Sequence, residues 1–216
     1  MELKLYHWLI IAAAIVAIIL LVIILYKPIR KLLYKKRYVQ IYYKDVYKVA
    51  KYEDYYLINN LILEIDPLAH THVDHILFAN KYIYVINDLY FDGEISGKAR
   101  DEKWIFTSGK KNKVKKEVRD NLFITNRDRI EKIALITMLD PELFISVIIA
   151  NNDLNLKDIE VNSKSDYIIH RRDLYKLVNA IESRPVAPMK EDELAQAVLD
   201  IDKLNLRHEL KKGKKK

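Results

Sequence analysis

The sequence predicts an α/β fold, in which a mixed β-sheet is flanked by helices and preceded by a single transmembrane helix. Three observations support this prediction. A stretch near the start, Trp8 to Tyr26, contains no charged residue, glycine or proline. Segments rich in β-branched and aromatic residues follow one another between residues 56 and 108. Beyond residue 120, helical spacing alternates with short apolar runs, which is the order expected of helices packed on a sheet.

The composition allows one ordinary globular domain with appendages. The chain has 216 residues, a net charge of +7 and no cysteine. Disulfides, thiolate metal sites and cysteine nucleophiles are therefore excluded, and the chain suits a reducing compartment. Residues 27–37 carry +6 and residues 207–216 carry +5, which leaves −4 for residues 38–206. Such basic flanks suit an anionic membrane surface at least as well as a polynucleotide.

The apolar stretch from Trp8 to Tyr26 is long enough to be a membrane span. Its 19 residues just cross a hydrocarbon core of about 30 Å. A cleaved secretory signal is the alternative, but the run is too long for a typical signal and no small-residue cleavage site follows it. Six cations follow the span, whereas Lys4 and the amino terminus precede it. The positive-inside rule therefore predicts a cell-membrane protein with a short outside N-terminus, residues 1–7, and a cytoplasmic C-terminal body.

Helical and extended segments can be assigned in order after the span. Residues 27–44 are predicted as a basic juxtamembrane helix, and helical spacing continues to about Glu53. Strands are predicted over residues 56–65, 72–79, 82–88 and 103–108, with residues 114–118 as the return strand of a hairpin.

The second half is predicted to add helices and a buried strand. Asn126 is the expected N-cap of the first of these helices. Helices are predicted over residues 126–139, 171–183 and 191–210, and strands over residues 143–150 and 165–170. The expected domain covers residues 45–183. A linker at residues 184–189 and an amphipathic helix with a Lys-rich tail, residues 190–216, follow it.

Four motifs occur in order within this body. They are "VDHILFANKYIYVINDLYFDGEISG" (residues 73–97), the following Trp104, "DNLFITNRDRIEKIA" (residues 120–134), and the closing strand and helix. Together they resemble the nuclease-related domain (NERD) family of the PD-(D/E)XK nuclease superfamily, over roughly residues 45 to 182. The resemblance implies a restriction-endonuclease-like core.

The resemblance also implies a chemistry for intact family members. An Asp on one strand and a Glu on the next hold Mg²⁺, a cation that prefers hard oxygen ligands. The metal polarises the phosphate and activates a water molecule. A Lys two residues after the Glu lies on the same strand face, where it orients the nucleophile or offsets negative charge.

The family positions can be carried over residue by residue. The metal-binding Asp matches Asp74, and its companion His matches His75. A further acidic residue on the first helix matches Glu53, in a weaker alignment. Trp104 and Asn121 also agree with the family pattern, although the proline that normally follows Asn121 is replaced by Leu122.

Two of the three central catalytic positions are chemically altered. Asn87 replaces the Glu, and it offers a neutral carbonyl oxygen instead of a negative charge. Leu89 replaces the Lys, and it can neither carry charge nor form a hydrogen bond. The neighbouring Asp88 is no substitute, because it points to the opposite face of the strand. We therefore expect a vestigial site with no intact catalytic residue and no cofactor, in which Asp74 is at most a weak metal ligand.

An active nuclease is the first alternative to this interpretation. Its Lys would be displaced to Lys81 or Lys98, and Mg²⁺ would be held by Asp74, Glu53 and Asn87. A second alternative is a structural membrane-proximal protein that makes no nucleic-acid contact.

Two groups of lysines are candidates for contact with nucleic acid or anionic lipid. The first group is Lys110, Lys111, Lys113, Lys115 and Lys116, and the second is Lys211, Lys212, Lys214, Lys215 and Lys216. Their attraction to phosphates is long-range and sensitive to salt. A charged turn or tail can also be merely solvated. The favoured interpretation is a membrane-anchored NERD-domain protein with a degenerate site that binds nucleic acid or protein without cleavage.

Overall fold

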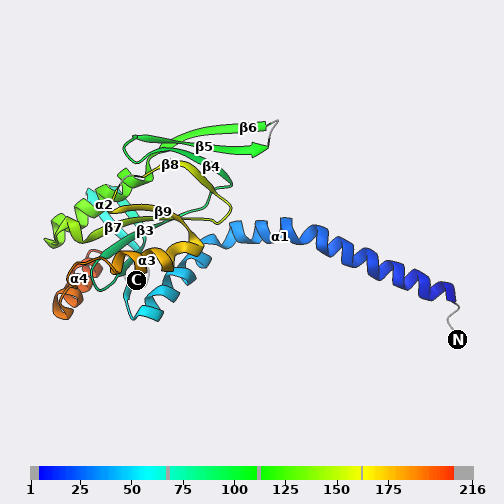
Figure 1. The fold of residues 1–216 in the computed structure, drawn as a ribbon, viewed down its shortest axis with the longest axis horizontal. Helices are drawn as coiled ribbons and strands as arrows, with labels where there is room; N and C mark the ends of the chain where they lie inside the picture. The colour runs from blue at the N-terminus through cyan, green and yellow to red at the C-terminus, as the bar shows by residue number, and fades with distance from the viewer. Residues whose placement is uncertain (1–4, 67–68, 111–112, 162, 207–216) are drawn as a thin grey trace, which may run out of the picture. The chain divides into compact units, whose positions relative to one another are not determined.

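A computed structural model describes residues 5–66, 69–110, 113–161 and 163–206 (Figure 1). The chain divides into two units, Met1–Ile41 and Tyr42–Lys216. The first helix, α1 (Leu5–Glu53), runs through the boundary between them.

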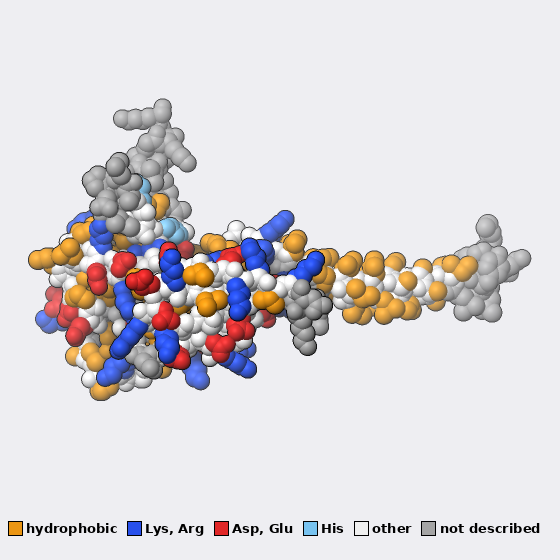
Figure 2. Space-filling view, turned by 90° about the horizontal axis from the view of Figure 1, so that it is seen from above, with side chains coloured by type: hydrophobic (Ala, Val, Ile, Leu, Met, Phe, Trp, Pro, Cys, Tyr) orange, Lys and Arg blue, Asp and Glu red, His pale blue; other side chains and the backbone are white. Residues whose placement is uncertain are grey.

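The first unit contains the apolar part of α1. The most apolar window of this helix has a mean hydropathy of 3.0, and none of it is buried. Figure 2 shows hydrophobic side chains along the visible face of this segment. Within the described residues, α1 is the one helix that is long and apolar enough to cross a membrane.

The second unit is built on two β-sheets. The five-stranded sheet has the order β1-β2-β3-β7-β9 and the four-stranded sheet the order β6-β5-β4-β8. The first three strands of the larger sheet are antiparallel, whereas β3, β7 and β9 run parallel. The strands of the larger sheet are β1 (Tyr56–Asp66), β2 (Ala69–Phe78), β3 (Ile83–Leu89), β7 (Phe144–Ala150) and β9 (Asp166–His170). Those of the smaller sheet are β4 (Gly93–Lys98), β5 (Lys103–Lys110), β6 (Lys113–Asp120) and β8 (Asn155–Glu160).

Helices cover both faces of the larger sheet. The helix α2 (Leu122–Thr137) contacts β3 and β7, and α4 (Glu191–Lys203) contacts α2 and β1. The helix α3 (Leu174–Glu182) lies on the side of the larger sheet that is opposite the smaller sheet (Figure 1). Two short 3₁₀ turns, η1 (Pro141–Leu143) and η2 (Arg171–Asp173), precede β7 and α3.

Buried apolar side chains form separate clusters on the α2 side of the larger sheet. One cluster joins β2 and β3 to α2 and α4, and includes Ile83, Val85, Ile133 and Ile201. The second cluster lies between the two sheets and α2. Its members include Leu89, Ile95, Trp104, Phe106, Phe123, Ile148 and Ala150. Through Leu89, this second cluster includes β3, the strand that also carries Asn87.

The predicted fold class is confirmed, with three differences in detail. Two sheets are present where one was expected, because β4 and β8 were not recognised in the sequence. The helix α2 begins at Leu122 and its N-cap is Asn121, so the prediction of Asn126 as N-cap is wrong. The last helix, α4, ends at Lys203 instead of near residue 210. Both strands that were missed are only partly buried and carry charged or glycine residues.

Candidate functional site

The two strands that carry the catalytic positions predicted from the sequence lie side by side. Strands β2 and β3 are antiparallel, and His75 pairs with Ile86. Strand alternation places Asn87 and Leu89 on one face of β3, and the Asp74 carboxylate reaches the backbone N–H between them. On the other face, His75 lies next to Asp88. The structure therefore brings four of the sequence-predicted residues together, on the two faces of one strand pair.

The Asp74 carboxylate is held by local polar contacts. Its Oδ2 accepts a hydrogen bond from the backbone N–H of Asp88 at 2.9 Å, and its Oδ1 lies 3.3 Å from Nδ1 of His72. Burial raises the pKa of Asp74, but the hydrogen bonds from His72 and Asp88 and the nearby histidine charges outweigh burial. The pKa of this carboxyl therefore lies below its usual value, and Asp74 is ionised at neutral pH.

Asn87 and Leu89 give this face an apolar and neutral character. The Asn87 side chain is buried, and its Oδ1 has no hydrogen-bond partner among the described residues. Leu89 is 9% exposed and packs in the cluster that contains Trp104 and Phe123. The position of the family's Lys is therefore part of the hydrophobic core.

Asp74, Asn87 and Leu89 do not fit a divalent cation. They offer one carboxylate, one neutral amide oxygen and a leucine, whereas Mg²⁺ is normally bound through carboxylates and retained waters. No group of three His, Asp or Glu residues that could hold a metal ion occurs in the part of the chain that the structure describes. The charge that a metal requires is thus missing at Asn87.

A buried histidine–carboxylate pair occupies the opposite face. Nε2 of His75 lies 3.2 Å from Oδ2 of Asp88, and both side chains are almost fully buried. Nδ1 of His75 lies 2.6 Å from Oδ1 of Asn59 on β1. Burial raises the pKa of Asp88, and the attraction of His75 only partly offsets this effect.

Glu53 and the candidate displaced lysines are engaged elsewhere. Oε1 of Glu53 accepts a hydrogen bond from the Tyr175 hydroxyl of α3 at 2.9 Å. Lys81 donates from Nζ to the backbone carbonyl of Arg184 at 2.6 Å. Lys98 pairs with Glu160 of β8 at 3.2 Å. Each of the three is therefore bonded to a residue other than Asp74.

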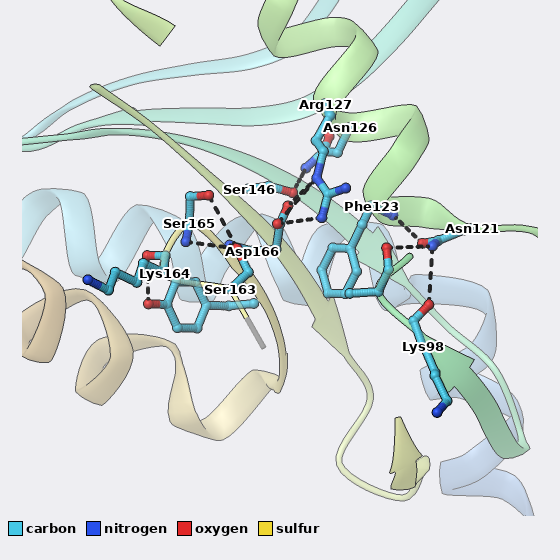
Figure 3. Close-up of polar contacts among 12 residues, drawn as sticks. Lys98, Asn121, Phe123, Asn126, Arg127, Ser146, Ser163, Lys164, Ser165 and Asp166 are labelled. Carbon is cyan, nitrogen blue, oxygen red and sulfur yellow. Dashed lines mark hydrogen bonds and ion pairs between the residues drawn. The ribbon is translucent and has the colours of Figure 1, made fainter. Parts of the chain in front are cut away.

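Two polar networks near the site were missed in the sequence. Asn126, fully buried in α2, donates from Nδ2 to the Val85 carbonyl and to Oγ of Ser146, both at 2.9 Å (Figure 3). The neighbouring Arg127 pairs with the buried Asp166 at 2.6 Å. These contacts attach α2 to β3, β7 and β9. In the sequence, the signal for the first network was the occurrence of two polar residues, Asn126 and Ser146, within apolar segments.

Asn121 and Trp104, the two agreeing family residues, connect α2 to the smaller sheet. Oδ1 of Asn121 accepts a hydrogen bond from the Phe123 N–H at 2.8 Å and so caps α2. Its Nδ2 faces three carbonyl oxygens of the turn after β4, the nearest being that of Asp101 at 2.7 Å (Figure 3). Nε1 of Trp104 donates to one of them, the Lys98 carbonyl, at 2.9 Å. Both residues therefore have structural roles in this chain.

The first lysine group lies on the hairpin of β5 and β6. Lys113, Lys115 and Lys116 are exposed on β6, which is an edge strand of the smaller sheet. Lys115 and Arg119 each lie 2.6 Å from Glu117, and their hydrogen bonds lower the pKa of Glu117 to about 2. Lys110 ends β5, whereas Lys111 and residues 211–216 lie outside the described residues. The strand therefore presents four cations together with two carboxylates, those of Glu117 and Asp120.

Comparison with known protein families gave one match. A family model described as the nuclease-related domain matches residues 39–151, which is slightly more than half of the chain. The match confirms the resemblance predicted from the motifs. Comparison with curated proteins and with solved structures gave no match.

Proposed function

Because the chain belongs to the nuclease-related domain (NERD) family, we propose that it is a membrane-anchored member with a degenerate nuclease site that binds nucleic acid without cleaving it. The observation that carries this proposal is the burial of Leu89 in the core cluster with Trp104 and Phe123. The family's chemistry needs a cation at that position to act on the nucleophile. A leucine that packs in the core supplies none.

The acidic side of the site supports the same conclusion. The Asp74 carboxylate reaches the backbone between Asn87 and Leu89, where it already receives the Asp88 N–H. Intact members hold the metal between two carboxylates on neighbouring strands, and here the second is the neutral Asn87. The proposed protein therefore needs no metal cofactor.

Nucleic-acid binding is assigned to the exposed cations of β6. Lys113, Lys115 and Lys116 are exposed on an edge strand, where a phosphate backbone has access to their side chains. Contacts of lysine with phosphate give affinity that depends on salt and not on sequence. We expect weak, non-specific binding to DNA or RNA. Anionic lipid should compete for the same cations.

The membrane anchor is assigned to the apolar part of α1. The six cations after Tyr26 favour a cytoplasmic body by the positive-inside rule. A cytoplasmic location would give the body access to cellular nucleic acid.

An active nuclease is the competing function, and one observation favours it. The buried Oδ1 of Asn87, beside Asp74, has no hydrogen-bond partner within the described ranges, and a cation could satisfy it. The two functions differ in whether phosphodiester bonds are broken.

The test uses the full chain in detergent or nanodiscs, with labelled single- and double-stranded DNA and RNA. We expect binding at low salt that weakens as salt rises, and no cleavage above background with Mg²⁺ or Mn²⁺. Metal-dependent cleavage that Asp74→Ala abolishes would establish the active nuclease instead. No binding even at low salt would leave the structural membrane-proximal role.

A further inference from the structure

A hollow of about 720 Å³ lies between the last turns of α1 and the start of α3. Its lining comes from α1, η2 and α3, all within the second unit. No residue of β2, β3 or β6 lines it, so it is separate from the nuclease position and from the lysine strand. Its volume is in the range of small-molecule binding sites.

The lining of this hollow has an excess of positive charge. Four of its side chains are cationic and one, Asp45, is anionic. Asp45 is paired with Arg171 at 3.1 Å, and both side chains are half-buried. This pair leaves Lys48, Lys51 and Arg172, all with exposed side chains. Arg172 lies 3.7 Å from Asp173, which is outside the lining, so Lys48 and Lys51 are the surplus cations. The hollow therefore favours an anionic ligand.

The remaining lining is apolar and aromatic. Val49 and Leu174 are buried, and they supply an apolar surface. The rings of Tyr52 and Tyr175 meet edge to face, with centroids 5.6 Å apart and an interplanar angle of 83°. Glu53 accepts a hydrogen bond from the Tyr175 hydroxyl and holds that ring in place. Tyr52 is 76% exposed, so most of its surface is open to a ligand.

We propose that this hollow binds a nucleoside phosphate, with the phosphates at Lys48 and Lys51 and the base against Tyr52. Inorganic phosphate would meet the cations but leave the tyrosines and the apolar surface uncovered. An uncharged aromatic ligand would cover the tyrosines but leave the cations without a partner. A nucleoside phosphate satisfies both parts of the lining, because a base has a flat π-face and the phosphates carry negative charge.

Binding is tested on the full chain in nanodiscs of neutral lipid by titration calorimetry. The probes are ATP, GTP, adenosine and inorganic phosphate, and vesicles of phosphatidylglycerol report binding of a lipid headgroup. We expect ATP or GTP to bind at least about tenfold more tightly than adenosine or inorganic phosphate. Equal affinity for inorganic phosphate would overturn the proposal. The proposal would also be overturned if phosphatidylglycerol bound through Lys48 and Lys51 and the nucleotides did not bind.

Substitutions then locate the bound nucleotide. The double substitution Lys48→Ala with Lys51→Ala should lower the affinity for nucleotide at least about tenfold. Tyr52→Ala should lower the affinity for nucleotide but not the affinity for inorganic phosphate. The control, Lys44→Ala with Lys176→Ala, removes the same charge from exposed positions of α1 and α3, outside the lining. Equal weakening by the control would show a general charge effect and overturn the site. Substitution of the β6 lysines should leave nucleotide binding unchanged, so this test is separate from that of the proposed function.

Discussion

His75 and Asp88 form a buried pair across β2 and β3, with Nε2 and Oδ2 3.2 Å apart. On the reverse face of the same strands, Asp74 accepts the backbone N–H of Asp88. The two carboxylates are thus adjacent but differ in environment. The pKa of Asp88 is raised, chiefly by burial, whereas hydrogen bonds hold the pKa of Asp74 below its usual value.

These opposite shifts predict opposite dependences of stability on pH. Asp74 has a lowered folded-state pKa, so its stabilisation is present above the ordinary value of 3.8 and is lost as pH falls. Asp88 has a raised folded-state pKa, so its contribution is most favourable below 3.8 and is lost as pH rises through the folded value. Asp74→Asn should therefore cost more at pH 7 than at pH 2, by about 1–3 kcal/mol at most. Asp88→Asn should cost relatively less at pH 7 than at pH 4.

Thermal unfolding of both variants and the unsubstituted chain, followed by tryptophan fluorescence between pH 2 and pH 7, tests this difference. Each variant serves as the control of the other, because both replace a carboxylate by an amide of the same size. The same direction of pH dependence in both variants would contradict the assigned environments.

Leu89 is predicted to be a core residue that tolerates shape changes but no charge. Leu89→Lys should lower the free energy of unfolding by about 2–5 kcal/mol, because a cation would be buried among Trp104 and Phe123. Leu89→Met is the matched control and should cost less than about 1.5 kcal/mol. Chemical denaturation measures both. If the lysine variant is as stable as the methionine variant, the side chain at this position can reach water and the site is open.

Much of the fold was predictable because its strands carry local signals. The β-branched and aromatic residues of β2 and β3 indicate strands, and the wholly buried β7 corresponds to the apolar run at residues 143–150. The smaller sheet was incompletely predicted because β4 and β8 pair in parallel across a long sequence separation. Gly93 and Gly97 also weaken the strand signal of β4. Only tertiary packing reveals that Gly97 must lack a side chain, since a Cβ there would lie 2.4 Å from Trp104.

The candidate site was predictable to a different extent on its two faces. Family motifs place Asp74 and Asn87 on neighbouring strands, and strand periodicity separates Asp88 from Asn87. Periodicity does not show what each face packs against. The contact of His75 with Asn59 depends on the register of β1. The burial of Asn126 depends on where α2 begins, and the sequence analysis placed the N-cap five residues too late.

The β6 strand is predicted to supply the salt-dependent part of nucleic-acid binding. Lys113→Ala, Lys115→Ala and Lys116→Ala together should reduce the slope of log affinity against log salt by about 1–3, since each phosphate contact contributes about 0.7–0.9. Lys115 is expected to contribute least because Glu117 partly neutralises it. Fluorescence anisotropy with a labelled oligonucleotide at several salt concentrations gives this slope.

A control variant removes three exposed cations outside β6, namely those of Lys44, Lys157 and Lys176. Its slope should stay close to that of the unsubstituted chain. If both variants lose the same slope, the attraction comes from net charge and not from the strand.

The orientation in the membrane is predicted from the cations after Tyr26. A reporter enzyme that works only in the cytoplasm should be active when it is fused after Lys216, and one that works only outside should be inactive. The reason is that translocating the basic segment at residues 27–37 is unfavourable. Replacing the six Lys and Arg residues of that segment with Gln should weaken this preference. Degradation of the C-terminal body by external protease in intact cells would refute the orientation.

Asn87 is predicted to be the position at which a metal site can be restored. Asn87→Glu places a second carboxylate on the strand next to that of Asp74, and two neighbouring carboxylates attract a hard divalent cation. Without metal, the like charges should destabilise the fold. At a Mg²⁺ concentration ten times the dissociation constant, binding should restore about 1.4 kcal/mol and raise the melting temperature by about 3–6 °C. Differential scanning fluorimetry with and without Mg²⁺ measures this increase.

Two further variants show whether the restored stability comes from this pair of carboxylates. Asn87→Gln has the same length without the charge and should show no response to Mg²⁺, and Asp74→Ala should abolish the response of Asn87→Glu. An equal response of the unsubstituted chain would mean that Asp74 and its natural neighbours already bind the cation. Asn87→Glu alone is expected to bind metal without cleaving nucleic acid, because Leu89 still occupies the position of the catalytic cation.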